Sequence, residues 1–146
     1  MPKFLFIGLN NSIFDSDILD TDSCILLIFF NTHCDFCQFE LKELEKRIPE
    51  FKNTEFVLVS AEPLDTLKKF NKQTDFYLYP NTGIYHCPYD TLQKYFGKLV
   101  SPTTFIYGTD RKLIRQFKGA TCIDNMLNVV RQAQVEQDSL SEKKSY

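Results

Sequence analysis

The chain has 146 residues, 43% of them hydrophobic and 25% charged, which is the composition of a single globular domain. Seventeen basic and 19 acidic side chains leave a formal net charge of −2, so we expect neither nucleic acid nor an anionic membrane surface as a partner. The five cysteines are an odd number that cannot all pair within the chain, which excludes a disulfide-stapled scaffold.

The first half of the chain alternates between predicted strands and predicted helices. Residues 24–30 form a continuous apolar run, which is typical of a strand buried on both faces and is too short to span a membrane. Residues 35–47 carry apolar side chains at helical spacing, and Pro49 ends that helix. Residues 55–60 repeat the buried-strand pattern, and residues 63–72 predict a second helix.

The second half continues the alternation and then ends differently. We expect a strand at 76–79, a helix at 90–96, a hairpin of strands at 103–107 and 112–118, and a final helix at 124–134. Strands that alternate with helices predict an α/β fold. The sheet should be central and mixed, with helices on both faces and a C-terminal β-β-α unit.

Two of the cysteines, Cys34 and Cys37, lie at the junction between the first strand and the first helix. A spacing of three residues lets the two sulfur atoms approach bonding distance. The unpaired N–H groups and the positive dipole end at a helix N-terminus stabilise a thiolate at Cys34. That thiolate can attack a disulfide, and Cys37 can then attack the mixed disulfide and release the product. The pair therefore indicates thiol-disulfide exchange.

A zinc site is the main alternative for the same cysteine pair. Such a site needs two further ligands, for which His33, His86 and Cys87 are the candidates. None of them completes a second C-x-x-C, so we expect no bound metal. Two inert thiols are the remaining possibility.

The chain resembles the TlpA/ResA-like thiol-disulfide oxidoreductases, which have the thioredoxin fold and lie close to the AhpC/TSA redoxins. The resemblance covers about residues 1–134, which we predict to be one domain followed by a polar, frayed tail at 135–146. Three sequence features carry it: Cys34-x-x-Cys37-x-x-Glu40 after the first strand, Ser101-Pro102-Thr103-Thr104-Phe105 with its following turn, strand and Gly119, and Pro2-x-Phe4 at the start.

The resemblance implies a role for each matching residue. Cys34 would be the exposed nucleophile and Cys37 the resolving thiol. Pro102 would be a cis proline facing the cysteines, and the backbone around Ser101 and Pro102 would pair with the extended chain of the substrate. Glu40 would take or supply the proton as thiol and thiolate interchange, unless it is only a solvated carboxylate on the helix surface.

The chain also departs from the thioredoxin pattern around the cysteines. Thioredoxins have Trp before the first cysteine and commonly Gly-Pro between the two, whereas this chain has His33 and then Asp35-Phe36. Ile28 stands where thioredoxin has a buried Asp. A protonated His33 would favour the thiolate, and Asp35 would oppose it. We expect His33 and Phe36 to contact a particular partner, with Phe36 forming an apolar lip.

The sequence therefore predicts an enzyme, a thiol-disulfide oxidoreductase that reduces protein disulfides. It would need no cofactor beyond its own redox-active disulfide, and it would act as a monomer on a protein substrate with an upstream redox partner. The family implies the periplasm or cell envelope, with the cytoplasm as the alternative.

Two other functions compete with this one. A redoxin-type thiol peroxidase would carry Thr three residues before its reactive cysteine, but Cys34 occupies that place before Cys37. A non-catalytic thioredoxin-like or zinc-binding module is the third possibility. Of the remaining thiols, we expect Cys24 in the core, Cys122 in helix packing and Cys87 in a loop, where it could lie near the site.

Overall fold

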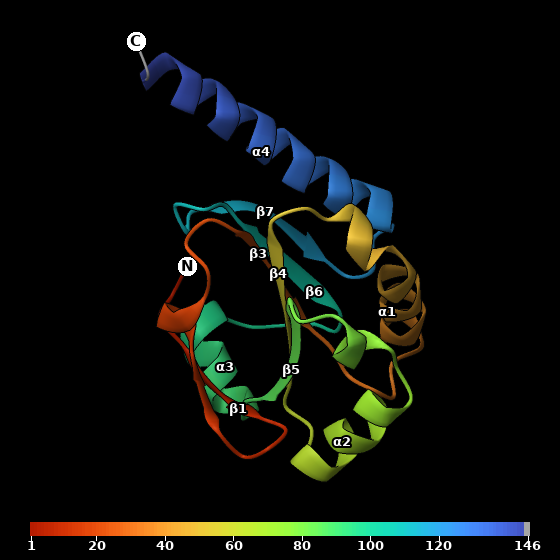
Figure 1. Ribbon diagram of the computed structural model, residues 1–146. Helices are drawn as coiled ribbons and strands as arrows, with labels where there is room; N and C mark the ends of the chain where they lie inside the picture. The colour runs from red at the N-terminus through yellow and green to blue at the C-terminus, as the bar shows by residue number, and fades with distance from the viewer. Residues whose placement is uncertain (145–146) are drawn as a thin grey trace.

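A computed structural model describes residues 1–144, with side chains through residue 140. Seven strands form one mixed sheet in the order β2-β1-β5-β4-β3-β6-β7 (Figure 1). The strands are β1 (Leu5–Gly8), β2 (Ile13–Asp15), β3 (Cys24–Phe29), β4 (Thr54–Ser60), β5 (Thr82–His86), β6 (Thr103–Tyr107) and β7 (Leu113–Lys118).

Four α-helices cover this sheet. Helices α1, α2 and α4 pack on one side of the sheet and α3 packs on the other, and the C-terminal part of α4 extends beyond the rest of the molecule (Figure 1). Their bounds are α1 (Asp35–Arg47), α2 (Leu64–Lys72), α3 (Tyr89–Phe96) and α4 (Ile123–Lys144). Among residues 1–144, no helix is both long enough and apolar enough to traverse a lipid bilayer.

The central strand β3 sets the geometry of the site. All six of its residues are buried, as its continuous apolar sequence predicts. It runs parallel to β4, with Phe29 opposite Val59, and antiparallel to β6, with Phe29 opposite Thr103. The carboxyl ends of β3 and β4 therefore meet the start of β6 at one edge of the sheet. Chain segments that leave these strands are brought together there.

The two faces of the sheet bury separate apolar clusters, because successive strand residues point to opposite sides. Leu26 and Ile28 join the cluster beneath α1 and α4, which also holds Cys37. Ile25 and Leu27 join the opposite cluster, which holds the rings of the N-terminal segment and α3. The predicted α/β fold class, with helices on both faces, is confirmed.

The strand predicted at 76–79 is wrong. That segment contains the 3₁₀ helix η3 (Phe76–Leu78), which buries Phe76 and leaves Tyr77 and Leu78 exposed. The hydroxyl of Thr82 donates to the carbonyl oxygens of Phe76 and Tyr79 and so closes this turn.

The missing strand is β5, a few residues further along, in a stretch expected to be a loop. It pairs in parallel with β4 and antiparallel with β1, with Ile84 opposite Leu58 and Tyr85 opposite Gly8. Gly83 and the polar residues at both ends weaken the local strand pattern, so the pairing comes from the two neighbouring strands.

Two further features were not predicted. The N-terminal residues form a hairpin, β1–β2, with Asn11 in the left-handed region (φ 66°) at its turn. Helix α4 continues to Lys144, ten residues beyond the predicted end at 134. Its C-terminal turns extend past the body of the domain (Figure 1), where Val135 and Leu140 are exposed.

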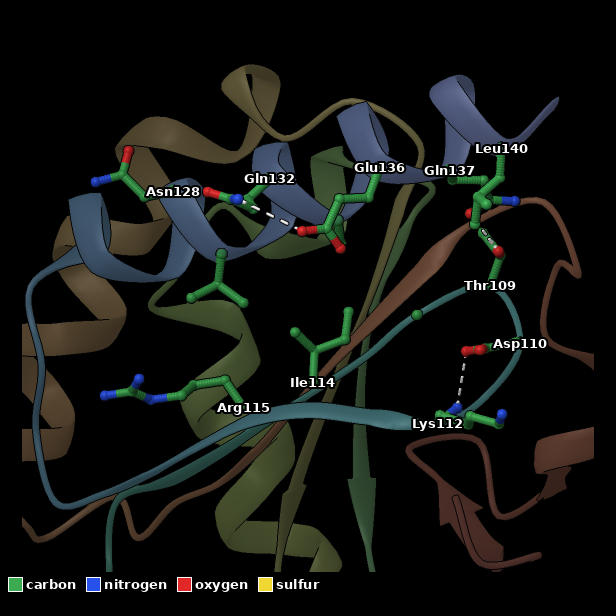
Figure 2. Close-up of a pocket in the computed structure, with 13 residues that line it drawn as sticks. Thr109, Asp110, Lys112, Ile114, Arg115, Asn128, Gln132, Glu136, Gln137 and Leu140 are labelled. Atoms are coloured by element: carbon green, nitrogen blue, oxygen red, sulfur yellow. Dashed lines mark hydrogen bonds between the residues drawn. The ribbon is translucent and has the colours of Figure 1, made fainter. Parts of the chain in front are cut away.

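An open groove lies between α4 and the β6–β7 hairpin (Figure 2). Thr109 of the turn and Ile114 of β7 form one wall, and Gln132, Glu136 and Leu140 of α4 form the other. None of the predicted site residues lines this groove.

Candidate functional site

The two cysteines lie where β3 passes into α1. After Phe30, whose N–H donates to the Val59 carbonyl (3.0 Å), a short loop leads to Cys34, the N-cap of α1. The Cys34 carbonyl accepts the N–H of Gln38 (3.0 Å) and begins the helix. Cys34 is half-buried and Cys37 is 1% exposed, and both are free thiols.

The surroundings of the two thiols differ in a way that suits exchange. No side-chain hydrogen bond caps the N-terminus of α1, and Cys34 is its N-cap residue, so the positive end of the helix dipole lies at the nucleophile. Burial raises the pKa of the Cys37 thiol to about 12, and the neighbouring Cys34 and Glu40 add to the rise, while a hydrogen bond with the Asn31 backbone opposes it. Cys37 is therefore held as a protonated thiol.

The carboxyl group of Glu40 lies beneath the cysteines, one turn further along α1, and is only 2% exposed. Its Oε2 accepts the N–H of Thr121 (2.9 Å) and its Oε1 accepts the hydroxyl of Thr104 (3.5 Å). Burial raises its pKa, and these two hydrogen bonds limit the rise. A buried carboxyl of raised pKa next to a buried thiol can exchange a proton with it.

The segment before β6 faces the pair from the other side. The Ser101–Pro102 peptide bond is cis, and the Ser101 carbonyl oxygen lies 3.9 Å from Sγ of Cys34. The Pro102 carbonyl accepts the N–H of Gly119 (2.8 Å), and the Thr103 hydroxyl donates to the Val100 carbonyl (2.6 Å). These bonds fix the backbone beside the thiol.

The other two predicted site residues are at the surface. Phe36, between the cysteines, is 71% exposed, and Phe39 on the same helix is 70% exposed. The His33 side chain is 85% exposed, with Nε2 3.8 Å from Oε2 of Glu62. The structure thus brings Cys34, Cys37, Glu40, Ser101 and Pro102 together, and it leaves Phe36 and His33 on the rim, available to a partner.

Sequence reasoning missed three residues of the site: Thr104, Thr121 and Glu62. The two threonines bind Glu40, and Glu62 binds the loop before Cys34. A signal existed for Glu62, because it follows a buried strand parallel to the strand that leads to the cysteines. The N–H of Thr121 carries no signal in the sequence, since a backbone contact depends only on the path of the chain.

The other cysteines lie apart from the pair. Cys87 lies in the short loop between β5 and α3, as expected of a loop thiol. It is 1% exposed in the cluster on the opposite face of the sheet from Cys37, away from the pair, and burial raises its pKa to about 11. Cys24 is buried, as expected, whereas Cys122, which was expected to take part in helix packing, is exposed just before α4. Within the described residues, no three His, Cys, Asp or Glu side chains are grouped so as to hold a metal ion.

Comparisons with solved structures place the fold among thioredoxin-like proteins. A protein described as a thioredoxin, from Neisseria meningitidis, is 18% identical with a TM-score of 0.77, covering 94% of this chain and 91% of its own. A secreted disulfide oxidoreductase of Mycobacterium tuberculosis is 17% identical with a TM-score of 0.73, covering 88% and 95%. An exposed lipoprotein thioredoxin of Streptococcus pneumoniae is 19% identical with a TM-score of 0.68, covering 89% and 98%.

The fold is therefore thioredoxin-like, with the cysteine pair at the N-terminus of its first helix. The sequence identifies the family more narrowly than the fold does. Residues 8–119 match the model of the AhpC/TSA family, and the chain belongs to that family, which confirms the redoxin branch predicted from its motifs. A search of curated proteins found no match to the sequence.

Proposed function

We propose that the protein is a thiol-disulfide oxidoreductase that reduces protein disulfides through Cys34 and Cys37. The observation that supports this most is the contrast between the two thiols: one half-buried at a helix N-terminus and one fully buried beside a carboxyl group. An exposed nucleophile and a protected resolving thiol are what the exchange reaction requires.

In the first step, the Cys34 thiolate attacks one sulfur of the substrate disulfide. A bond forms between Cys34 and that sulfur, the substrate S–S bond breaks, and the other substrate sulfur leaves as a thiolate. The extended substrate segment lies along the Ser101–Pro102 backbone, 3.9 Å from the Cys34 sulfur, with Phe36 as an apolar contact and His33 at the rim.

In the second step, Cys37 attacks the Cys34 sulfur of the mixed disulfide. The Cys34–Cys37 bond forms, the bond between Cys34 and the substrate sulfur breaks, and that substrate sulfur leaves as a thiolate that takes up a proton. The pKa of about 12 makes the Cys37 thiol a poor nucleophile until it loses its proton, and we assign that proton to the carboxylate of Glu40. The protein is thereby oxidised by two electrons, and a dithiol partner returns it to the reduced state.

The redox-active disulfide is the only prosthetic element that this scheme needs, and a monomer suffices. Two of the similar structures are described as a secreted oxidoreductase and an exposed lipoprotein. By analogy we place this protein in the periplasm or cell envelope, where protein disulfides form and need correction.

The test is the reduction of insulin by dithiothreitol, followed by the precipitation of the reduced chains. Wild type should accelerate precipitation, Cys34→Ser should not, and Cys122→Ser should match wild type because that thiol lies outside the site. An inactive wild type would refute the proposal. Consumption of hydrogen peroxide by wild type, without insulin reduction, would favour a thiol peroxidase instead.

A further inference from the structure

The carboxylate of Glu62 is bound to the loop that carries the nucleophile. Glu62 follows β4 by two residues, and its side chain is 12% exposed. Oε1 accepts the backbone N–H of Thr32 (2.7 Å), and Oε2 accepts the Thr32 hydroxyl (2.7 Å). Hydrogen bonds to an ionised acceptor are the strong ones, and here two of them converge on a residue two positions before Cys34.

Glu62 is itself held firmly from the sheet. The hydroxyl of Ser60 donates to its Oε1 (3.0 Å), and its own N–H donates back to that hydroxyl (3.1 Å). Nδ1 of His86, at the end of β5, lies 2.6 Å from its carbonyl oxygen. Ser60 of β4 thus holds the carboxylate and His86 of β5 holds the backbone of the same residue, so that Glu62 forms an anchor on two strands of the central sheet.

Residues 31–33 of the loop between β3 and α1 need such an anchor, because among the described residues their backbone makes no hydrogen bond to a neighbouring strand. A second anchor acts from the helix side, where Nε2 of Gln38 donates to the Thr32 carbonyl (2.6 Å). Within the loop, Asn31 accepts the N–H of His33 through Oδ1 (2.9 Å) and the N–H of Cys34 through its carbonyl (3.2 Å). Thr32 is therefore held through its N–H, its carbonyl and its hydroxyl.

We propose that Glu62 is a positioning residue of the exchange reaction: by clamping Thr32 to β4, it sets where the sulfur of Cys34 lies relative to the N-terminus of α1 and the Ser101 carbonyl. This proposal rests on the proposed function, since it concerns the nucleophile of that reaction. It gives Glu62 a geometric role and predicts that the hydrogen bonds, and not the negative charge, are what matters.

The alternative role is electrostatic, and it has the opposite sign. A carboxylate near Cys34 opposes a thiolate there by Coulomb repulsion, which the neighbouring His33 would offset when protonated. If charge were the working element, removing it would make Cys34 more reactive. The geometric role and the electrostatic role can therefore be separated by comparing Glu62→Gln with Glu62→Ala.

The experiment measures the alkylation rate of Cys34 by iodoacetamide in the reduced, folded protein at about pH 7. Peptide mass spectrometry follows Cys34 alone, because Cys122 is also exposed and reacts. Four single variants are compared with wild type: Glu62→Gln, Glu62→Ala, Thr32→Val and, as the control, Glu43→Ala, which removes a half-buried carboxylate from α1 that makes no contact with the loop. Insulin reduction is measured on the same samples.

We expect Glu62→Ala to slow alkylation about tenfold, because a misplaced nucleophile loses the support of the helix N-terminus. Glu62→Gln should stay within about threefold of wild type, since its amide oxygen still accepts the Thr32 N–H and its amino group can donate to the Thr32 hydroxyl. Glu43→Ala should have no effect. Faster alkylation in both Glu62 variants, or no change in Glu62→Ala, would overturn the proposal.

The double variant Thr32→Val/Glu62→Ala completes a double-mutant cycle on the two residues. If both residues act through one clamp, the double variant should be as slow as Glu62→Ala within about twofold, whereas independent effects would multiply and contradict the clamp. Thr32→Val, which keeps the backbone bond, also serves if Glu62→Ala does not fold. If wild type fails to reduce insulin, the proposed function falls, yet the alkylation rates still decide whether Glu62 positions Cys34.

Discussion

The replacement of Glu40 by glutamine tests how the resolving thiol is activated. A pKa of about 12 leaves only ~10⁻⁵ of Cys37 as thiolate at pH 7, so the second step of exchange needs a base. Glu40→Gln keeps an acceptor for the N–H of Thr121 and the shape of the buried side chain, but it removes the base. General-base catalysis contributes roughly 10²–10⁴-fold, which sets the expected loss in the second step.

The assay separates the two steps with an aromatic disulfide that releases a coloured thiol. Attack by Cys34 releases the first equivalent, and attack by Cys37 on the resulting mixed disulfide releases the second. Cys122→Ser serves as the background, so that this exposed thiol adds no signal. In Glu40→Gln, the first release should stay within about twofold of the background protein, and the second should slow by about a hundredfold or more.

The pH dependence of the second release tests the role of Glu40 independently. In the parent protein the second release should rise as Glu40 loses its proton, at a pH above the ordinary carboxyl value because burial raises that pKa. In Glu40→Gln the rate of the second release should instead keep rising as the pH approaches the pKa of the Cys37 thiol. Equal rates of the second release in the two proteins, or a slowing of the first release alone, would refute the role of Glu40.

Three further predictions concern stability. Since burial raises its pKa in the folded state, the protonated form of Glu40 favours the fold below pH 4.5, and this contribution is lost as the pH rises through the folded value. Urea unfolding should therefore show the advantage of Glu40→Gln over wild type growing as the pH rises above 4.5. Leu44→Ala, at a fully buried position of α1, should cost about 2–5 kcal/mol in the same assay. Deletion of residues 135–146 should cost less than about 1 kcal/mol, if residues 1–134 are the domain as we propose, because Val135 and Leu140 are exposed.

The strand-to-helix unit that carries the cysteines could be predicted from sequence because local and tertiary preferences agree there. The apolar run of β3 needs two buried faces, and the helical spacing of α1 gives it one buried stripe. The spacing of Cys34 and Cys37 then fixes both thiols on the first turn. The chemistry of the pair followed from their place in the fold.

The parts that sequence reasoning missed depend on contacts between distant segments. Strand β5 is a strand because β1 and β4 leave a gap between them, and its own sequence only weakly favours one. Glu62 lies 30 residues from its partner Thr32, and Thr121 lies 81 residues from Glu40. No local pattern marks such pairs, so the surroundings of the site emerge only from the fold.

A redox titration of the purified protein in thiol-disulfide buffers shows whether Cys34 and Cys37 form a redox-active pair. After acid quenching and alkylation, mass spectrometry would identify which cysteines are joined. We expect one two-electron transition with a disulfide between Cys34 and Cys37, while Cys24, Cys87 and Cys122 remain alkylatable throughout. A pair that stays reduced under every buffer, or a disulfide that involves another cysteine, would contradict the account.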